Sequence, residues 1–323
     1  MSDVASINLL DQMELDLEHV ENALVSSFQT GVEDFNCLIR PLSAAGGKRL
    51  RAQLCLLVAL GGESVQEERV KIAEAVEMLH LATLIHDDVL DQADIRRGED
   101  TIHSHKGNKV AILSGDYLFA KAFTIVSEME STEYLRIFSY IISCLVEGEF
   151  MQMEDVYRID QGIERYMTKT QKKTADFMEG CMELGGLLGG WSPEDVVNLK
   201  KYGHALGMAF QITDDIMDYR ETTETTGKPV GNDLREGLLT YPLLSIVTKD
   251  NGATLLEQIK NLHNGGDEQA IIDYVIAEGG INNTLAVADA YCNDAIQALE
   301  QLPDFEGKPF LMMAVENLAN RKV

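Results

Sequence analysis

The chain has 323 residues, of which 45% are hydrophobic and 25% charged, the balance of a globular protein rather than a disordered one. Lysine and arginine number 27 and aspartate and glutamate 53, so the net charge is −26. A chain this acidic repels nucleic acid and anionic membranes, and we expect neither as a partner. Only six prolines occur, which favours long helices over a turn-rich sandwich or barrel.

The cysteines and the N-terminal residues bear on the compartment. The five cysteines are far apart and form no CxxC pair, which argues against a cysteine-ligated zinc site or a disulfide framework. The first 20 residues are acidic and amphipathic, unlike a signal peptide. No apolar run approaches the roughly 18 residues needed to span a bilayer. We therefore expect a cytoplasmic protein with reduced core thiols and no transmembrane segment.

Apolar residues recur with helical spacing along almost the whole chain. In the first pattern Leu9, Met13, Leu17 and Val20 share one face. The patterns cover about 9–20, 53–60, 65–90, 109–129, 132–155, 163–189, 193–219, 234–248, 267–278, 281–301 and 308–320. Glycine and proline separate them, and neither an alternating strand pattern nor a GxGxxG motif is present. These features predict a single all-α domain over residues 1–323, without an internal boundary.

A short acidic pattern occurs twice, as HDDVLD at 86–91 and as TDDIMD at 213–218. Its members are Asp87, Asp88 and Asp91 in the first cluster and Asp214, Asp215 and Asp218 in the second. Outer acids four residues apart share a helix face, where like charges repel. A divalent cation turns that repulsion into binding, and magnesium bound to phosphate oxygens fits such a site. One copy is as readily a solvated acidic face, but two copies in apolar helical context favour a metal site.

Cations are clustered in this acidic chain. They occur in GGKRLR (46–51), at Arg96-Arg97, at Lys172-Lys173 and at Lys228. Each alone is more often a solvated surface pair, and the first is not a P-loop. Together with the aspartates they predict a pocket for two diphosphate groups, one held through magnesium and the other by arginine and lysine directly.

Seven runs carry a family resemblance. They are GGKRLR (46–51), EMLHLATLIHDDVLDQADIRRG (77–98), GDYLFAKAF (115–123), EGEFMQ (147–152), KTA (173–175), LGMAFQITDDIMDY (206–219) and GKPVGNDLREG (227–237). Through them the chain resembles the trans-isoprenyl diphosphate synthases, the polyprenyl synthetase family, over residues 40–250. The resemblance implies a helical bundle with a central cavity. It also implies a prenyltransferase of heptaprenyl or octaprenyl type that joins isopentenyl diphosphate to an allylic diphosphate.

The resemblance also assigns roles to residues. Magnesium is implied to bind the allylic diphosphate, with about three ions when substrate is present. Its implied ligands are Asp87, Asp91, Asp214 and Asp218, with Asp88 and Asp215 in support. Isopentenyl diphosphate is implied to be bound by Lys48, Arg51, His80 and Arg97. The allylic substrate is implied to be bound by Arg96, Lys173, Thr174, Gln211 and Lys228, with Lys173 also counted as catalytic. By spacing alone His80 is an ordinary core histidine. Leu238 stands where the family often has a lysine, so that contact is not carried over.

Product length follows from small residues one helical turn, about 5.4 Å, before Asp87. The growing chain extends from the diphosphate toward the N-terminus of that helix, where Ala82 and Thr83 leave space. Short-chain relatives tend to carry a bulky aromatic here, so the resemblance implies a product of about C30 to C40, such as a quinone side-chain precursor. Candidates for the deeper floor are Met78, Leu79 and residues near Phe138–Leu145.

Four alternative functions are compatible with part of this sequence. A short-chain farnesyl or geranylgeranyl synthase differs only in product. A terpene cyclase usually replaces the second acidic motif, which is intact here. A di-iron bundle needs two ExxH motifs, and only Glu77 and His80 form one. A non-catalytic partner subunit is not expected to keep all six aspartates. The resemblance implies a homodimer, although a catalytic half of a heteromer is equally compatible.

Overall fold

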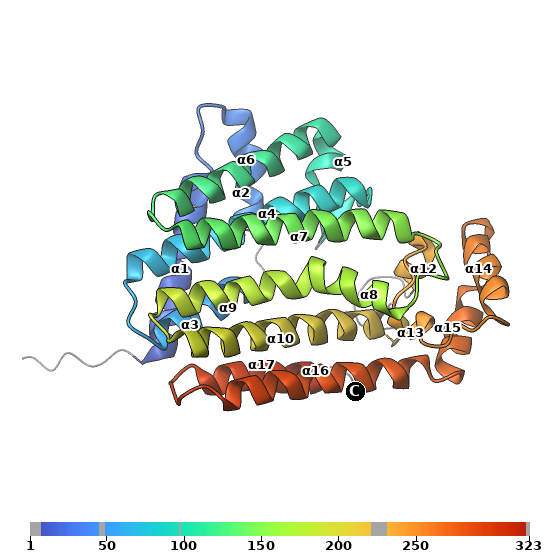
Figure 1. Cartoon of the computed structure of the whole chain (residues 1–323). Coiled ribbons are helices and arrows are strands. Elements are labelled where there is room, and N and C mark those ends of the chain that lie inside the picture. Colours follow the sequence, from blue (N-terminus) through green and yellow to red (C-terminus); the bar gives the residue numbers. More distant parts are fainter. Residues whose placement is uncertain (1–7, 45–48, 97, 221–230, 321–323) are drawn as a thin grey trace, which may run out of the picture. The chain divides into compact units, whose positions relative to one another are not determined.

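The computed structural model describes residues 8–44, 49–96, 98–220 and 231–320, and the described part is dominated by helices (Figure 1). The N-terminal helices are α1 (Leu9–Ser27), α2 (Glu33–Ala44), α3 (Leu50–Leu60), α4 (Gln66–Leu90), α5 (Ile102–Lys106) and α6 (Asn108–Ser127). The middle helices are α7 (Thr132–Asp155), α8 (Ile163–Thr170), the π-helical turn η1 (Gln171–Ala175), α9 (Asp176–Leu188) and α10 (Pro193–Arg220). The C-terminal helices are α12 (Asn232–Glu236), α13 (Tyr241–Leu244), α14 (Gly252–Lys260), η2 (Asn261–Asn264), α15 (Glu268–Ala277), α16 (Gly280–Glu300) and α17 (Lys308–Asn320).

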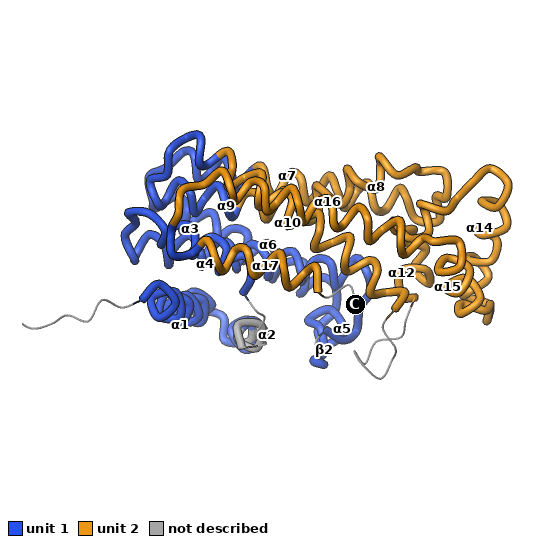
Figure 2. The backbone as a smooth tube through the Cα atoms, turned by 90° about the horizontal axis from the view of Figure 1, so that it is seen from below, with its two compact units in different colours: residues 1–139, 181–196, 305–307 blue, residues 140–180, 197–304, 308–323 orange. Residues whose placement is uncertain are grey.

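The chain divides into two compact units, drawn in blue and orange in Figure 2. Unit 1 comprises residues 1–139, 181–196 and 305–307, and unit 2 comprises residues 140–180, 197–304 and 308–323. Each unit is built from segments far apart in the sequence. The first aspartate cluster belongs to unit 1 and the second to unit 2.

Unit 1 is centred on α4, which packs against α1, α3 and α6. Its apolar side chains Ile72, Val76 and Met78 are completely buried. One polar contact joins α1 to α4, where the guanidinium of Arg69 donates to the carboxylate of Asp16 at 2.7 Å. Both side chains are buried, so loss of either partner leaves an uncompensated charge in the core.

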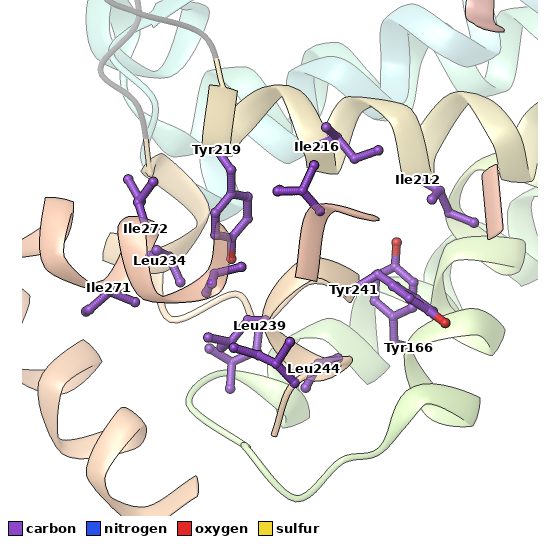
Figure 3. Packing of buried hydrophobic residues seen from close by; sticks show 14 of the residues in the cluster. Tyr166, Ile212, Ile216, Tyr219, Leu234, Leu239, Tyr241, Leu244, Ile271 and Ile272 are labelled. Carbon is purple, nitrogen blue, oxygen red and sulfur yellow. The ribbon is translucent and has the colours of Figure 1, made fainter. Parts of the chain in front are cut away.

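Unit 2 contains an apolar cluster beneath the C-terminal half of α10. Ile212, Ile216 and Tyr219 of α10 pack with Leu234, Leu239 and side chains of α15 (Figure 3). Helical geometry places residues 214 and 218 on a different face from residues 212, 216 and 219. The cluster therefore fixes the helix rotation that presents the second aspartate cluster.

Local structure departs from the sequence prediction in several places. Helices α2, α5 and α14 and the short turn η2 were not predicted, and η1 interrupts the pattern over 163–189. The pattern over 234–248 contains two short helices, α12 and α13. Gly237, with a φ of 74°, ends α12, and a proline near the start of α13 favours a new helix. A two-residue hairpin, β1 (Ile95–Arg96) with β2 (Glu99–Asp100), follows α4, since so short a ladder has no periodicity to detect.

Helix α6 requires a second correction. It is long and apolar enough to cross a membrane by length and composition alone, with a mean hydropathy of 1.4 over 18 residues. Its scattered charges hide this in the sequence. Core helices pass the same test, and α6 packs against α4, so this single helix is weak evidence for a membrane span. Four of the five cysteines are buried, as the prediction of core thiols requires, whereas Cys37 is exposed.

Candidate functional site

The first aspartate cluster lies at the C-terminal end of α4. Asp88 is buried, Asp87 is half-buried and Asp91, the residue that caps the helix, is exposed. Asp88 accepts a hydrogen bond at 2.5 Å from Nε of Arg96, which belongs to strand β1 of the hairpin. Burial raises the pKa of Asp88, and Arg96 opposes that shift. The middle acid is therefore fixed by an arginine, while the outer acids form the i, i+4 pair.

The predicted isopentenyl diphosphate residues of unit 1 meet at the start of α3. Nη1 of Arg51 lies 3.4 Å from Nε2 of His80. Burial lowers the pKa of Arg51, whereas the charges of Cys181, Glu77 and Asp87 oppose the shift. Arg51 and His80 are thus brought together within electrostatic range of the first cluster. Their predicted companions Lys48 and Arg97 lie outside the described residues.

Glu77 has a structural role at the same helix start. Its carboxylate accepts hydrogen bonds from Nη1 of Arg49 and from the backbone N–H of Ala52, both at 3.2 Å. Arg49 has a φ of 45°, a left-handed conformation that this pairing holds in place. Glu77 therefore anchors the turn that presents Arg51. Because both its carboxylate oxygens serve α3, the ExxH motif does not indicate a di-iron site.

The second aspartate cluster shows the same division between its middle and outer acids. Asp215 is buried, Asp214 is exposed and Asp218 is half-buried. Asp215 accepts hydrogen bonds from the hydroxyl of Tyr166 on α8 and from Nε2 of Gln211. The carboxylate of Asp218 accepts the backbone N–H groups of residues 232 and 233, at 3.1 and 3.2 Å. This carboxylate therefore joins the end of α10 to the start of α12.

Carboxylates are crowded around this cluster. Burial, together with the charge of Asp214, raises the pKa of Asp215 to about 6, against the hydrogen bonds of Tyr166 and Gln211. Burial also raises the pKa of Asp218 and of Asp233. Charged carboxylates buried together repel one another at neutral pH, and a divalent cation would offset that repulsion.

The predicted allylic-diphosphate residues of unit 2 gather on the π-helical turn η1. Such turns are frequent at functional sites because an extra residue re-aims the side chains. Nζ of Lys173 lies 2.5 Å from the carboxylate of Glu149 on α7. Oγ1 of Thr174 donates to Oε1 of Gln211 at 2.9 Å. Gln211 in turn donates to Asp215 at 3.0 Å, so a hydrogen-bonded chain joins η1 to the second cluster.

Two glycines allow neighbouring helices to approach η1 closely. A Cβ at position 148 of α7 would lie 2.7 Å from Cγ of Lys173, and one at position 207 of α10 would lie 2.6 Å from Cα of Ala175. Neither distance is tolerated by real side chains. Gly148 and Gly207 therefore allow α7 and α10 to pack closely against η1, the turn that carries Lys173 and Thr174.

Four residues predicted to set product length lie in the described helix α4, whereas predicted Lys228 lies outside the described residues. Ala82, Met78 and Leu79 are completely buried, whereas Thr83 is half-buried and donates its hydroxyl to the backbone oxygen of His80 at 2.7 Å. The stand-in for the usual family lysine, Leu238, is half-buried.

Four residues near the second cluster were not identified from the sequence. They are Tyr166, Lys169, Asp155 and Asp233. Lys169 is buried 4.0 Å from Asp155, and burial lowers its pKa while Asp155 and Asp215 oppose the shift. A buried lysine or tyrosine in a helix of ordinary pattern gives no local signal. Tyr166 and Asp215 are 49 residues apart, so only the tertiary fold joins them.

Comparison with known proteins decides the family. The family described as Polyprenyl synthetase matches residues 33–278. The chain belongs to the polyprenyl synthetase family. Heptaprenyl diphosphate synthase component 2 of Geobacillus stearothermophilus is 34% identical over 297 residues, 92% of each chain. The expected enzyme class, a prenyltransferase that makes polyprenyl diphosphates, is thereby confirmed.

Solved structures of the family agree with this fold. Heptaprenyl diphosphate synthase from Staphylococcus aureus aligns with a TM-score of 0.88 at 29% identity and covers 99% of this chain and 100% of its own. A polyprenyl synthase from Caulobacter crescentus, solved with calcium and isoprenyl diphosphate, aligns with a TM-score of 0.88 at 31% identity, over 98% of this chain and 97% of its own. The predicted all-α bundle of the isoprenoid synthase type is confirmed.

Proposed function

We propose that this polyprenyl synthetase condenses isopentenyl diphosphate with an allylic diphosphate to make a trans-polyprenyl diphosphate. The observation that carries the proposal is the chain from Thr174 through Gln211 to Asp215, at 2.9 and 3.0 Å. It connects side chains suited to phosphate oxygens with an acidic cluster suited to a cation. A solvated acidic face has no need of such support.

Magnesium fits both acidic clusters by the chemistry of the donor set. Each cluster offers carboxylate oxygens, the ligands magnesium prefers, and its outer members lie at i, i+4. Burial raises the pKa of Asp215 and of Asp218, a cost to their charged forms that a bound cation would offset. Asp87, Asp91, Asp214 and Asp218 are the proposed ligands, with Asp88 and Asp215 in support. Bound magnesium would neutralise the leaving diphosphate and so favour its departure.

The two clusters are assigned to one allylic diphosphate. Their parallel construction supports this: the middle acid of each is buried and hydrogen-bonded, and the outer acids are more exposed. Residues 1–323 are accordingly proposed to act as one catalytic domain. Lys173, Thr174, Gln211, Arg96 and Lys228 are the proposed partners of the same diphosphate.

Isopentenyl diphosphate is assigned to the cations of unit 1. Arg51 and His80 are already in contact, and Lys48 and Arg97 are proposed to complete the set. Arg51 keeps its charge despite burial, as arginines do, and can hold diphosphate oxygens through two N–H groups. The electron pair of the isopentenyl double bond then attacks the allylic carbon and a proton is lost. No side chain is assigned as the base, and the departing diphosphate takes that role.

Product length is proposed to be about C30 to C40, from the small residues one turn, about 5.4 Å, before Asp87. Ala82 is completely buried and Thr83 half-buried. Both side chains are small, so neither forms a bulky floor. Completely buried Met78 and Leu79 belong to the proposed deeper wall. Apolar walls serve a second purpose, because water would quench an allylic cation.

A partner subunit is proposed to cover an apolar stripe on α7. Val146, Phe150 and Met153 recur at helical spacing on one face and are exposed, Phe150 to 63%, and exposed Tyr140 lies beside that face. A second copy of this chain is the proposed occupant, in the cytoplasm. The relative named component 2 makes a different subunit the alternative. Sedimentation of Phe150→Glu, with Met313→Glu as an exposed control in unit 2, distinguishes a dimer contact from an incidental stripe.

The product assay tests the function directly. Purified chain, alone, is incubated with magnesium, labelled isopentenyl diphosphate and a C10, C15 or C20 allylic primer, and the products are identified by mass spectrometry. A polyprenyl ladder of about C30 to C40 supports the full proposal. Products that stop at C15 or C20 indicate the short-chain alternative, and a cyclised hydrocarbon indicates a terpene cyclase. Activity that appears only with a second subunit places this chain as the catalytic half of a heteromer.

A further inference from the structure

A histidine and two acids that belong to neither aspartate cluster meet in unit 2. Asp176 and Glu179 lie at i, i+3 on α9, and His204 approaches from α10. One ligand atom from each of the three lies within 4.8 Å of the other two. The group borders a cavity of about 680 Å³, lined by Glu179 and His204 as well as by residues of α16.

One pair of these residues has the spacing of two ligands on one ion. Nδ1 of His204 lies 3.5 Å from Oε2 of Glu179. Two ligands about 2.1 Å from a tetrahedral zinc ion lie roughly 3.4 Å apart. The other carboxylate oxygen of Glu179 lies 3.5 Å from Nζ of Lys200, so the lysine engages the oxygen that a cation on Oε2 would leave available. Outer contacts of this kind orient a ligand.

Asp176 supplies a second, independent observation. Its side chain is 2% exposed, and Oδ2 is buried without a hydrogen-bond partner. Its other oxygen accepts from Nε2 of Gln171 at 3.2 Å, which holds the carboxylate in place. A buried carboxylate oxygen left unpaired is costly, and a cation is a group that satisfies it.

We propose that Asp176, Glu179 and His204 form a binding site for a divalent transition metal such as Zn²⁺, which ties α9 to α10. The imidazole nitrogen selects against Mg²⁺ and Ca²⁺, which take oxygen ligands. Three protein ligands leave a position for water from the adjacent cavity. The site is separate from the proposed magnesium ligands and does not depend on the proposed function.

Metal titration of the untagged protein in excess Mg²⁺ tests the site, with Zn²⁺ in calorimetry and Co²⁺ in absorption spectroscopy. The variants are His204→Ala and the nearly isosteric Asp176→Asn, and exposed His105→Ala is the matched control. Each is also made in an Asp87→Ala/Asp214→Ala background, which removes one proposed magnesium ligand from each acidic cluster. Circular dichroism in chelator confirms that each variant is folded.

Wild type and His105→Ala are expected to bind one equivalent of Zn²⁺. His204→Ala and Asp176→Asn are expected to bind it at least about tenfold more weakly, in both backgrounds. A crystal soaked with Zn²⁺ is expected to show anomalous density between the three side chains. Equal titration curves for wild type and His204→Ala, or zinc density only at other positions, would overturn the proposal.

Discussion

The hydroxyl of Tyr166 donates a hydrogen bond to the buried carboxylate of Asp215, so α8 directly supports the middle acid of the second cluster. The tyrosine is 2% exposed, and burial followed by the charge of Asp215 raises its pKa. It therefore remains a hydrogen-bond donor throughout the physiological range. The outer acids, Asp214 and Asp218, flank a carboxylate whose orientation is set from another helix.

Tyr166→Phe should disturb metal use rather than only stability. The substitution removes a hydrogen bond that favours the charged form of Asp215, so we expect turnover to fall about tenfold and the Mg²⁺ requirement to rise. The measurement is initial rate against Mg²⁺ concentration. Tyr202→Phe is the matched control, because buried Tyr202 donates instead to a backbone oxygen of residue 311. An equal change in Mg²⁺ requirement in both variants would contradict the assignment.

Asp215→Asn should stabilise the protein in chelator at neutral pH. Its carboxyl has a pKa near 6 in place of 3.8, so the fold favours its protonated form. The wild-type free energy of unfolding then falls as pH rises from about 4 to 6, by at most about 3 kcal/mol from this group. Asparagine removes that loss, and its amide oxygen can still accept the hydrogen bond from Tyr166. Urea unfolding at pH 4 and 7.5 measures the free energy of unfolding of both proteins. A wild type that is more stable than Asp215→Asn at pH 7.5 would contradict the prediction.

Asp87→Ala and Asp214→Ala should each lower turnover by about two orders of magnitude or more, with the helix content unchanged. Each removes an outer acid proposed to hold magnesium on the leaving diphosphate. Exposed Asp304→Ala, which loses only an i, i+4 pair with Lys308, is the control. Labelled isopentenyl incorporation is the readout. Near-normal rates in either variant would remove that cluster from the reaction.

Thr83→Phe and Ala82→Phe should shorten the product. Both place an aromatic ring one turn before Asp87, where the growing chain is proposed to pass. Ala82 is completely buried, so its replacement also strains the core by about 1–3 kcal/mol. Half-buried Thr83 tolerates the larger side chain better and keeps the test informative if the first variant unfolds. Mass spectrometry of the product ladder is the measurement, and an unchanged ladder in a folded Thr83→Phe excludes this path.

Local pattern was enough to predict the long helices and the placement of both acidic clusters upon them. The apolar residues around Asp87 and Asp214 carry the helical period, and their i, i+4 spacing survives in α4 and α10. The local sequence pattern did not predict contacts between helices. Nothing near Tyr166 indicates its partner, and the π turn at Thr174 depends on Gly148 and Gly207 of other helices. Short helices such as α12 end through backbone geometry at single glycines rather than through periodicity.

A crystal structure with magnesium and a non-reactive allylic thiodiphosphate tests the central claim most directly. The account predicts one diphosphate whose magnesium ions bind carboxylate oxygens of Asp87 and Asp91 and also of Asp214, at about 2.1 Å. Thr174 or Lys173 should contact the same diphosphate. A diphosphate held through one acidic cluster alone, with the other cluster facing solvent, would contradict it.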